Sequence, residues 1–218
     1  MLEEEKTKKH EKKVSAITGV FFSEMFRTIL IVVLLVVVTR FFIIQPFIVK
    51  GSSMEPNFQD NEYIFVEEVS SKVAGFSRGN VVIFKHPENQ CTQFINESFI
   101  KSIFLQGPCT NFIKRVIGLP GETMVIKDGT IKIKNKEHPD GFILDESYIP
   151  KDDTYKLKGD MTRTIKEDEY FVLGDNRQPN ASLDSREWGV LPKNHITGKA
   201  WLVVLPFDKF GLVSHPKY

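Results

Sequence analysis

Residues 125–133 read Val-Ile-Lys-Asp-Gly-Thr-Ile-Lys-Ile, and this stretch decides the fold class. Apolar and polar side chains alternate on both sides of Asp128 and Gly129, which is typical of strands with one buried face. The Asp-Gly pair supplies the two positive-φ positions that a tight two-residue turn requires. The stretch therefore predicts an antiparallel β-hairpin, with strands at 123–127 and 130–134.

Similar short runs lie on either side of this hairpin and are bounded by Gly, Pro and Asn. We expect further strands at residues 63–67, 81–85, 112–117, 170–173 and 199–205. Short strands at such a spacing are typical of an antiparallel sandwich or barrel. Residues 139–168 are charged and poorly periodic, which predicts a surface excursion. The expected fold class is mainly β.

Upstream of the strands, residues 28–49 read TILIVVLLVVVTRFFIIQPFIV, with ten consecutive aliphatic residues from Ile29 to Val38. As a helix, residues 28–44 would extend about 25 Å, which suits a ~30 Å bilayer core if Arg40 snorkels. A buried β-rich core is less consistent with so long a run. A cleavable signal peptide is less consistent because no small-residue cleavage site follows. We therefore expect a retained transmembrane helix.

The positions of Lys and Arg around this run predict its direction. Two basic residues follow it, Arg40 and Lys50, whereas six precede it: Lys6, Lys8, Lys9, Lys12, Lys13 and Arg27. The positive-inside rule then makes residues 1–27 a cytoplasmic segment and places residues 45–218 outside the cytoplasmic membrane. The expected topology is a single pass.

The overall composition argues against several classes of protein. The 29 Lys and Arg balance 28 Asp and Glu, so the chain lacks the basic footprint of a nucleic-acid-binding protein. Its five histidines are scattered, and its two cysteines lack the spacing of a zinc site. We expect neither a metal nor another cofactor. Cys91 and Cys109 lie in a stretch, 87–110, that resembles an insertion; a disulfide and two separate buried thiols are both consistent with the sequence.

Three polar segments carry residue types that together suit nucleophilic catalysis. They read VKGSSMEP at 49–56, FIKRVIGLPGE at 112–122, and GDNR at 174–177 followed by SLDSR at 182–186. A serine hydroxyl needs a base, and a lysine can serve once burial has removed its proton. Lowering a lysine pKa from about 10.4 to about 7–8 corresponds to roughly 4 kcal/mol. Strand alternation would place Lys114 between Phe112 and Val116 on one apolar face.

Each segment alone has an ordinary interpretation, but the combination resembles the bacterial, Ser/Lys form of the type I signal peptidase family. The family's Ser-Met-x-Pro matches residues 53–56, and its Lys-Arg-Val-x-Gly-x-Pro-Gly matches residues 114–121. Its Gly-Asp-Asn-Arg and Ser-x-Asp-Ser-Arg match 174–177 and 182–186. The lysine separates this chain from the eukaryotic and archaeal form, in which a histidine takes that place.

The resemblance implies a serine endopeptidase in which Ser53 attacks the scissile carbonyl and Lys114 is the general base. The Ser53 N–H would belong to the oxyanion hole, whereas Gly51 leaves the second donor open. Ser182 would orient the lysine. The remaining implied roles are an ion pair, Asp184 with Arg186; a loop support, Asp175; and shallow substrate pockets, Val49, Met54, Phe112 and Ile113.

The resemblance also implies the architecture and the partners. An antiparallel β catalytic domain, with its core at about 45–121 and 170–206, would carry a small inserted β subdomain at about 122–169. Exposed apolar surface would lie on the lipid bilayer, and the substrates would be signal peptides of exported preproteins. The sequence alone does not separate general processing from a peptidase dedicated to one exported protein, such as a conjugation or pilus component. A soluble repressor-type protease and a non-enzymatic tethered β-domain explain fewer of these features.

Overall fold

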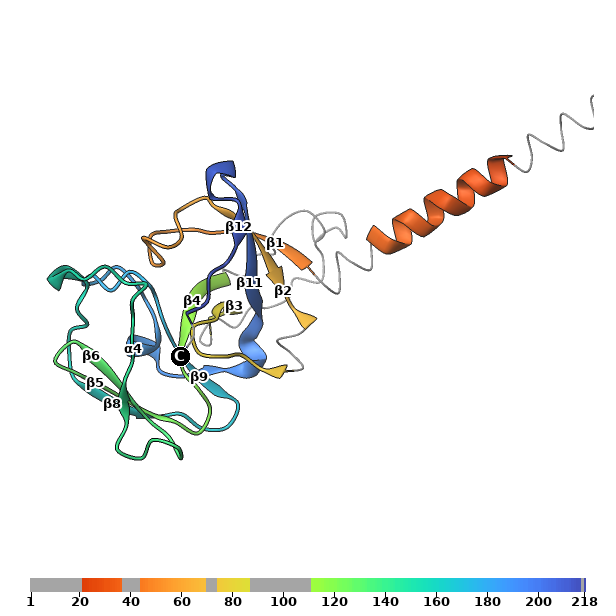
Figure 1. Cartoon of the computed structure of the whole chain (residues 1–218). Coiled ribbons are helices and arrows are strands. Elements are labelled where there is room, and N and C mark those ends of the chain that lie inside the picture. Colours follow the sequence, from red (N-terminus) through yellow and green to blue (C-terminus); the bar gives the residue numbers. More distant parts are fainter. Residues whose placement is uncertain (1–20, 37–43, 70–73, 87–110, 217) are drawn as a thin grey trace, which may run out of the picture. The chain divides into compact units, whose positions relative to one another are not determined.

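The computed structural model describes residues 21–36, 44–69, 74–86, 111–216 and 218. The chain divides into two units, residues 1–43 and 44–218. In the first unit, residues 21–36 form a helix (Figure 1). Its side chains are exposed along the whole described length. No helix in the described ranges is both long enough and apolar enough to cross a membrane. Residues 37–43 of the expected anchor lie outside the described residues, as do Cys91 and Cys109.

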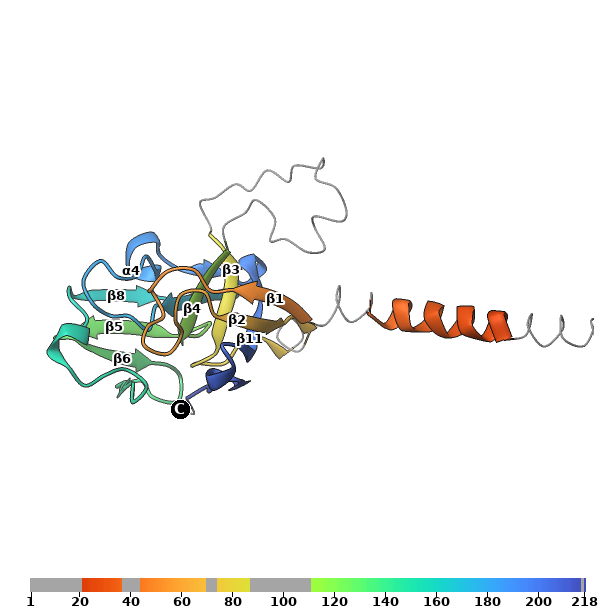
Figure 2. The same ribbon diagram turned by 90° about the horizontal axis from the view of Figure 1, so that it is seen from above.

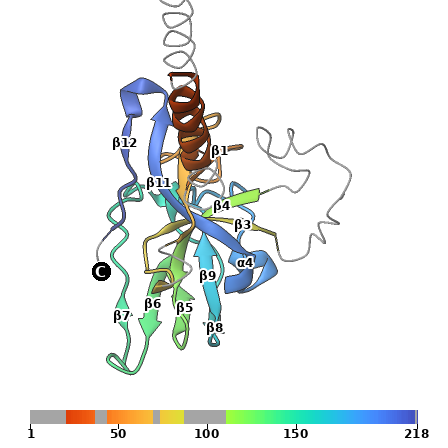
Figure 3. The ribbon, with the colours of Figure 1, turned by 90° about the vertical axis from the view of Figure 1, so that its right-hand side faces the viewer.

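The second unit is built on an antiparallel sheet of eight strands. Its order is β1-β2-β11-β3-β4-β9-β10, and β12 also pairs with β11. The strands are β1 Ile44–Ile48, β2 Tyr63–Glu67, β3 Val81–Lys85, β4 Asn111–Gly118, β9 Glu169–Leu173, β10 Leu191–Pro192, β11 Ile196–Leu205 and β12 Gly211–Leu212. Because β11 pairs with β2 on one side and with β3 on the other, this late strand joins two strands from the start of the unit. Figure 3 shows β11 beside its other partner, β12.

The strand β1 differs from the sequence-based expectation. Ile44 was expected to be the last residue of the membrane anchor, but it begins a strand that pairs with β2, opposite Glu67. The apolar run 28–49 gives no sign of this change because apolar residues continue through it. Pro46 is tolerated there because β1 lies at the edge of the sheet, where one side of the strand needs no ladder donors.

Between β4 and β9 the chain forms a second, four-stranded sheet, in the order β7-β6-β5-β8. Its strands are β5 Thr123–Lys127, β6 Thr130–Lys134, β7 Phe142–Ile143 and β8 Met161–Thr164, and Figure 2 shows β5, β6 and β8 side by side. The expected hairpin is present, with Asp128 and Gly129 both at positive φ. The surface excursion predicted for 139–168 is wrong in part, because β7 and β8 fall within it and complete this sheet.

The two sheets share buried apolar side chains. One cluster combines Ile117, Phe171 and Leu173 of the large sheet with residues of the small one, including Met124 and Ile133. The helical segments that the structure describes from end to end in this unit are short: η1 Asp153–Tyr155, α4 Ser185–Trp188, η2 Lys193–His195 and η3 Phe207–Lys209. The described domain is therefore mainly antiparallel β, as expected, and its inserted sheet packs directly on the strands that precede and follow it.

Candidate active site

Ser53 and Lys114 meet although they are 61 residues apart in the sequence. Ser53 lies in the turn between β1 and β2, and Lys114 lies in the middle of β4. The Lys114 Nζ donates a hydrogen bond of 2.6 Å to Ser53 Oγ and another of 2.9 Å to the carbonyl oxygen of Ile113. Lys114 is only 2% exposed. A hydroxyl and an amine are thus held in contact, largely away from water.

The surroundings of Lys114 favour its neutral form. Burial lowers its pKa to about 8, although the charges of Asp184 and Asp175 act in the opposite direction; the charge of Arg186 lowers it further. Its side chain lies on the same face as Phe112, with Nζ 6.0 Å from the centre of that ring. A lysine with an ordinary pKa of about 10.4 would hold almost no free amine at neutral pH, whereas this one holds roughly a tenth at pH 7.

The turn that carries Ser53 is fixed from the loop after β9. The Asn176 N–H donates to the carbonyl oxygen of Ser53 at 3.0 Å, and Asn176 Nδ2 donates to that of Ser52, also at 3.0 Å. On the other side of the turn, the Gly51 N–H donates to Asp60 Oδ1 at 2.8 Å. Backbone groups flanking the serine are therefore bound on both sides, which limits the positions its side chain can take.

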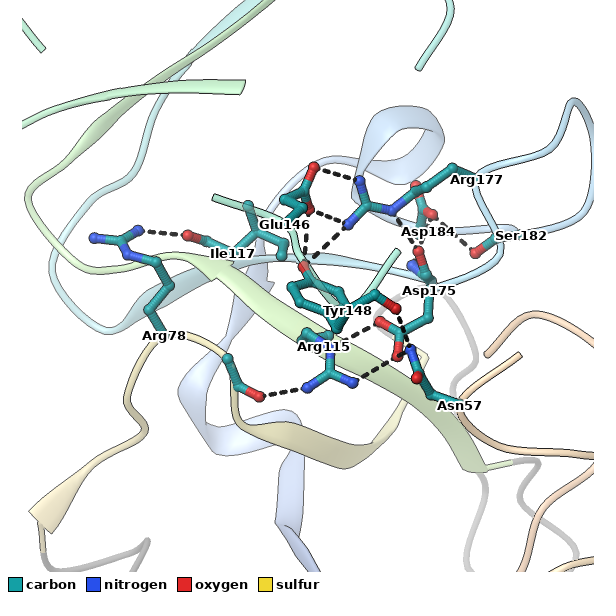
Figure 4. A network of polar contacts seen from close by, with 12 residues as sticks. Asn57, Arg78, Arg115, Ile117, Glu146, Tyr148, Asp175, Arg177, Ser182 and Asp184 are labelled. Atoms are coloured by element: carbon teal, nitrogen blue, oxygen red, sulfur yellow. Dashed lines mark hydrogen bonds and ion pairs between the residues drawn. The ribbon is translucent and has the colours of Figure 1, made fainter. Parts of the chain in front are cut away.

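Ser182 does not contact Lys114 in the way that the resemblance implies. Its hydroxyl donates to Asp184 Oδ2 at 2.8 Å, as Figure 4 shows, and among the described residues it makes no hydrogen bond to Lys114 Nζ. This hydrogen bond to a carboxylate is charge-assisted and therefore stronger than one between neutral groups. We call Ser182, Asp184 and Arg186 the wall beside Lys114. Ser182 acts on the lysine only as part of this wall.

Asp184 and Arg186 form an ion pair within that wall. Arg186 Nε lies 2.8 Å from Asp184 Oδ1 and Arg186 Nη2 lies 2.9 Å from Asp184 Oδ2. Burial by itself would raise the pKa of Asp184, but the hydrogen bonds and charge of Arg186, with the N–H of Gly174 and the hydroxyl of Ser182, lower it. Asp184 also caps the short helix α4 through the Arg186 N–H. A buried carboxylate thus remains ionised near Lys114.

Asp175 has a partner that sequence reasoning did not assign. Arg115, the residue after Lys114, points to the opposite face of β4 and donates to both carboxylate oxygens of Asp175, at 2.8 and 2.6 Å. Both side chains are buried. The signal was the Lys-Arg pair in the motif itself, since alternation along a strand sends neighbouring side chains to opposite faces.

The four residues expected to shape substrate pockets are not all together. Val49, Met54 and Ile113 are buried in one apolar cluster, which also includes Phe47. Phe112 instead packs on a different cluster, with its ring stacked against Phe84.

In the described ranges there is no group of three or more His, Cys, Asp or Glu side chains placed to hold a metal ion.

Comparisons with known proteins place these features in context. Residues 22–205 match the family described as signal peptidase, peptidase S26. Signal peptidase I of Bacillus licheniformis is 32% identical over 188 residues, which cover 85% of this chain and 90% of that protein. Signal peptidase I T of Bacillus subtilis strain 168 is 30% identical over 208 residues, 94% of this chain and 96% of that protein. A crystal structure of a signal peptidase I from Enterococcus faecalis is 28% identical, with a TM-score of 0.39, and covers 57% of this chain and 95% of its own.

Proposed function

The chain belongs to the signal peptidase family, peptidase S26, and on that premise we propose that it removes N-terminal signal peptides with a Ser53–Lys114 dyad at the outer face of the cytoplasmic membrane. Membership makes it a peptidase of the signal peptidase I kind, which hydrolyses peptide bonds. The observation that supports the dyad best is the 2.6 Å contact between Lys114 Nζ and Ser53 Oγ at a buried amine.

The proposed chemistry follows from that contact. When Lys114 is neutral, its lone pair accepts the proton of the Ser53 hydroxyl while Oγ attacks the scissile carbonyl. The Ser53 N–H donates to the oxyanion of the tetrahedral intermediate. Lys114 then returns the proton to the leaving amine, and the signal peptide remains as an ester on Oγ. In the second half, Lys114 takes a proton from water as the water oxygen attacks the ester carbonyl, and then gives that proton to Ser53 Oγ as the C–O bond breaks and the signal peptide leaves with a free carboxyl group.

The residues around the dyad have supporting roles in this proposal. Asp175 holds Arg115, and Asp184 with Arg186 and Ser182 forms the wall beside Lys114. The side chains of Val49, Met54 and Ile113 lie together in one apolar cluster, and in this proposal they support the surface on which small side chains of the substrate would rest.

Membrane attachment is also part of the proposal. From Ile29 to Val36 the described helix exposes only apolar side chains, on every side of its axis. A helix that is apolar on every side is stable when it is enclosed by protein or by lipid. Together with the aliphatic run to Val38 and the basic residues before it, this favours an anchor that starts near residue 28 and ends before β1, with residues 1–27 in the cytoplasm.

The proposed substrate can be tested directly. We expect the detergent-solubilised chain to cut a secreted preprotein once, after an Ala-x-Ala sequence, because the resemblance to the family implies shallow pockets for small side chains. Mass spectrometry of the products identifies the bond. Cleavage of several unrelated preproteins would support general processing; a chain that cuts one exported pilus or conjugation protein, and no other, would contradict it. The relatives are named signal peptidase I, so the dedicated peptidase is not favoured.

The pH dependence tests the role of Lys114. Because the base must be neutral, kcat/KM should rise about tenfold per pH unit below the pKa of about 8 and level off above it. The profile is read from initial rates on a fluorogenic peptide between pH 5.5 and 10. An apparent pKa near 10.4, the ordinary value, would mean that the reacting lysine is not desolvated. A plateau already reached at pH 6 would indicate a different base.

A further inference from the structure

A short segment of the inserted sheet region reaches all three catalytic segments. Glu146 and Tyr148 follow β7 and lie against the loop after β9, as Figure 4 shows. Sequence reasoning assigned no role to either residue, since both fall within the charged stretch 139–168. Their contacts nevertheless form a connected set.

The first contact fixes the Gly174–Arg177 loop. Arg177 is buried and donates to both carboxylate oxygens of Glu146, to Oε2 at 3.0 Å. Its Nε donates to the carbonyl oxygen of Gly174 at 2.7 Å. The Tyr148 hydroxyl donates to Glu146 Oε1 at 2.8 Å, so the carboxylate has three donors on it.

The second set of contacts reaches the serine turn and the lysine strand. Asn57, four residues after Ser53, donates from Nδ2 to the Tyr148 carbonyl oxygen at 3.1 Å and to Asp175 Oδ2 at 2.9 Å. The ring of Tyr148 lies under the guanidinium of Arg115, whose central carbon is 4.4 Å from the ring centre. Arg115 follows Lys114 on β4, so this stacking bears on the strand that holds the base.

We propose that Glu146 and Tyr148 are positioning residues, which lock the loop after β9, the serine turn and β4 in the register that brings Ser53 to Lys114. This inference rests on the proposed dyad. Neither residue needs to touch the substrate: Glu146 acts through Arg177 and Gly174, and Tyr148 acts through Asn57 and Arg115. We call Glu146 and Tyr148 the clamp; through them the inserted subdomain helps to position the dyad.

A loosened clamp has a signature that lost stability alone does not produce. The charged groups that act on Lys114 are Asp184, Asp175 and Arg186, whereas burial is the largest influence on its pKa. If this clamp loosens, water reaches the Lys114 amine and the pKa of Lys114 rises. Removing the charge of Glu146 could only lower a lysine pKa, because a carboxylate favours the ammonium form. An upward change therefore reports position and not charge.

The experiment compares Glu146→Gln and Tyr148→Phe with Glu122→Gln in the full-length, detergent-solubilised protein. Glu122 is a matched control: it also accepts two hydrogen bonds from a buried arginine, Arg78, at 2.9 and 2.6 Å, but it contacts neither the dyad nor the loop after β9. For each variant we would measure kcat, KM and the pH profile on one peptide with an Ala-x-Ala site, and thermal unfolding.

For Glu146→Gln we expect kcat to fall about 10- to 100-fold, since a displacement of about 1 Å at reacting groups has effects of this size. KM should change less than about twofold, and the apparent pKa should rise. Tyr148→Phe, which removes one hydrogen bond and keeps the ring, should lower kcat about fivefold with the same upward change. Glu122→Gln should lower the unfolding temperature while its apparent pKa stays that of the unchanged protein.

Two outcomes would overturn the proposal. One is a Glu146→Gln variant with unchanged kcat and apparent pKa; the other is a change in pKa of equal size in Glu122→Gln. If Glu146→Gln does not fold, Tyr148→Phe decides by the same two readouts. Ser53→Ala separates this proposal from the dyad itself, because an active Ser53→Ala protein refutes the dyad, whereas an inactive one beside an unaffected Glu146→Gln refutes only the clamp.

Discussion

Ser53→Ala and Lys114→Met should each reduce preprotein cleavage by about 1,000-fold or more, and the double variant should be no less active than either single one. In the proposed mechanism the two side chains act in one proton transfer. Once one of them has been removed, removing the other therefore has little further effect on the rate. Single-turnover rates on a purified preprotein, with the N-terminal helix 21–36 retained, measure the effect. The expected loss follows from the direct contact of 2.6 Å between the two reacting atoms.

Lys114→Met should at the same time stabilise the fold at neutral pH. The pKa of Lys114 is about 8 in the folded chain and about 10.4 once unfolded, so the unfolded state binds more protons between these values. Below pH 8 the buried ammonium therefore lowers the free energy of unfolding by about 3 kcal/mol, and this penalty fades as the pH rises toward 10.4. The unfolding temperature of Lys114→Met should exceed that of the unchanged protein at pH 6.5 by more than it does at pH 10.

Ser52→Ala is the matched control for the serine. Ser52 is exposed, and the contact that its residue makes with Asn176 is through the backbone carbonyl, which alanine retains. Its activity should therefore stay within about threefold of the unchanged protein, the rate equivalent of less than one hydrogen bond. An inactive Ser52→Ala with an active Ser53→Ala would mean that the nucleophile is one residue earlier. A Lys114→Met enzyme that still turns over at pH 8 would refute the lysine base.

The parts of the fold that could be predicted are those with local signals. Strands at 63–67, 81–85, 123–127 and 130–134 have the expected bounds because alternation or a continuous apolar run ends at turn residues. The strands that were missed are β7, β10 and β12, of two residues each, together with β8 and β1. A strand of two residues is too short to show the alternation of apolar and polar side chains, and β1 continues an apolar run that had been assigned to a helix.

The site, like the fold, could be predicted from the sequence only in part. Residue types and motifs singled out Ser53 and Lys114, but no spacing in the sequence requires residues 61 apart to meet; pairing of β3 with β4 and the fixing of the serine turn by Asn176 place them together. The hydrogen bond from Ser182 to Asp184 has no signal in the sequence, because the conformation of the 182–186 segment decides which groups the hydroxyl reaches. Glu146 could not be singled out, because its partner Arg177 lies 31 residues away in a separate segment.

Gly174→Ala should lower kcat/KM by about 100-fold while most of the protein remains folded. A Cβ at residue 174 would lie closer than 3.0 Å to both Ser182 Oγ and the carbonyl oxygen of Ser53, and 2.7 Å from Ser182 Cβ. The serine oxygen belongs to the backbone and cannot rotate away, so the whole turn must move. Overpacking of this kind destabilises by about 1–3 kcal/mol, and a shift of about 1 Å at the nucleophile accounts for the loss of rate.

Gly118→Ala is the control that separates the effect of added volume in a packed region from the effect of moving the Ser53 turn. Its Cβ would also meet an atom closer than 3.0 Å, but that atom is the flexible end of Ile165, in the core shared with the small sheet. It should lower the unfolding temperature to a similar degree and leave kcat within about threefold, since nothing at the dyad has to move. Adding Ser182→Gly to Gly174→Ala relieves two of the three close contacts, yet the clash with the Ser53 carbonyl persists, so activity should not return. Full activity in Gly174→Ala, or its recovery in that double variant, would show that the Ser53 turn does not depend on the approach of residue 174.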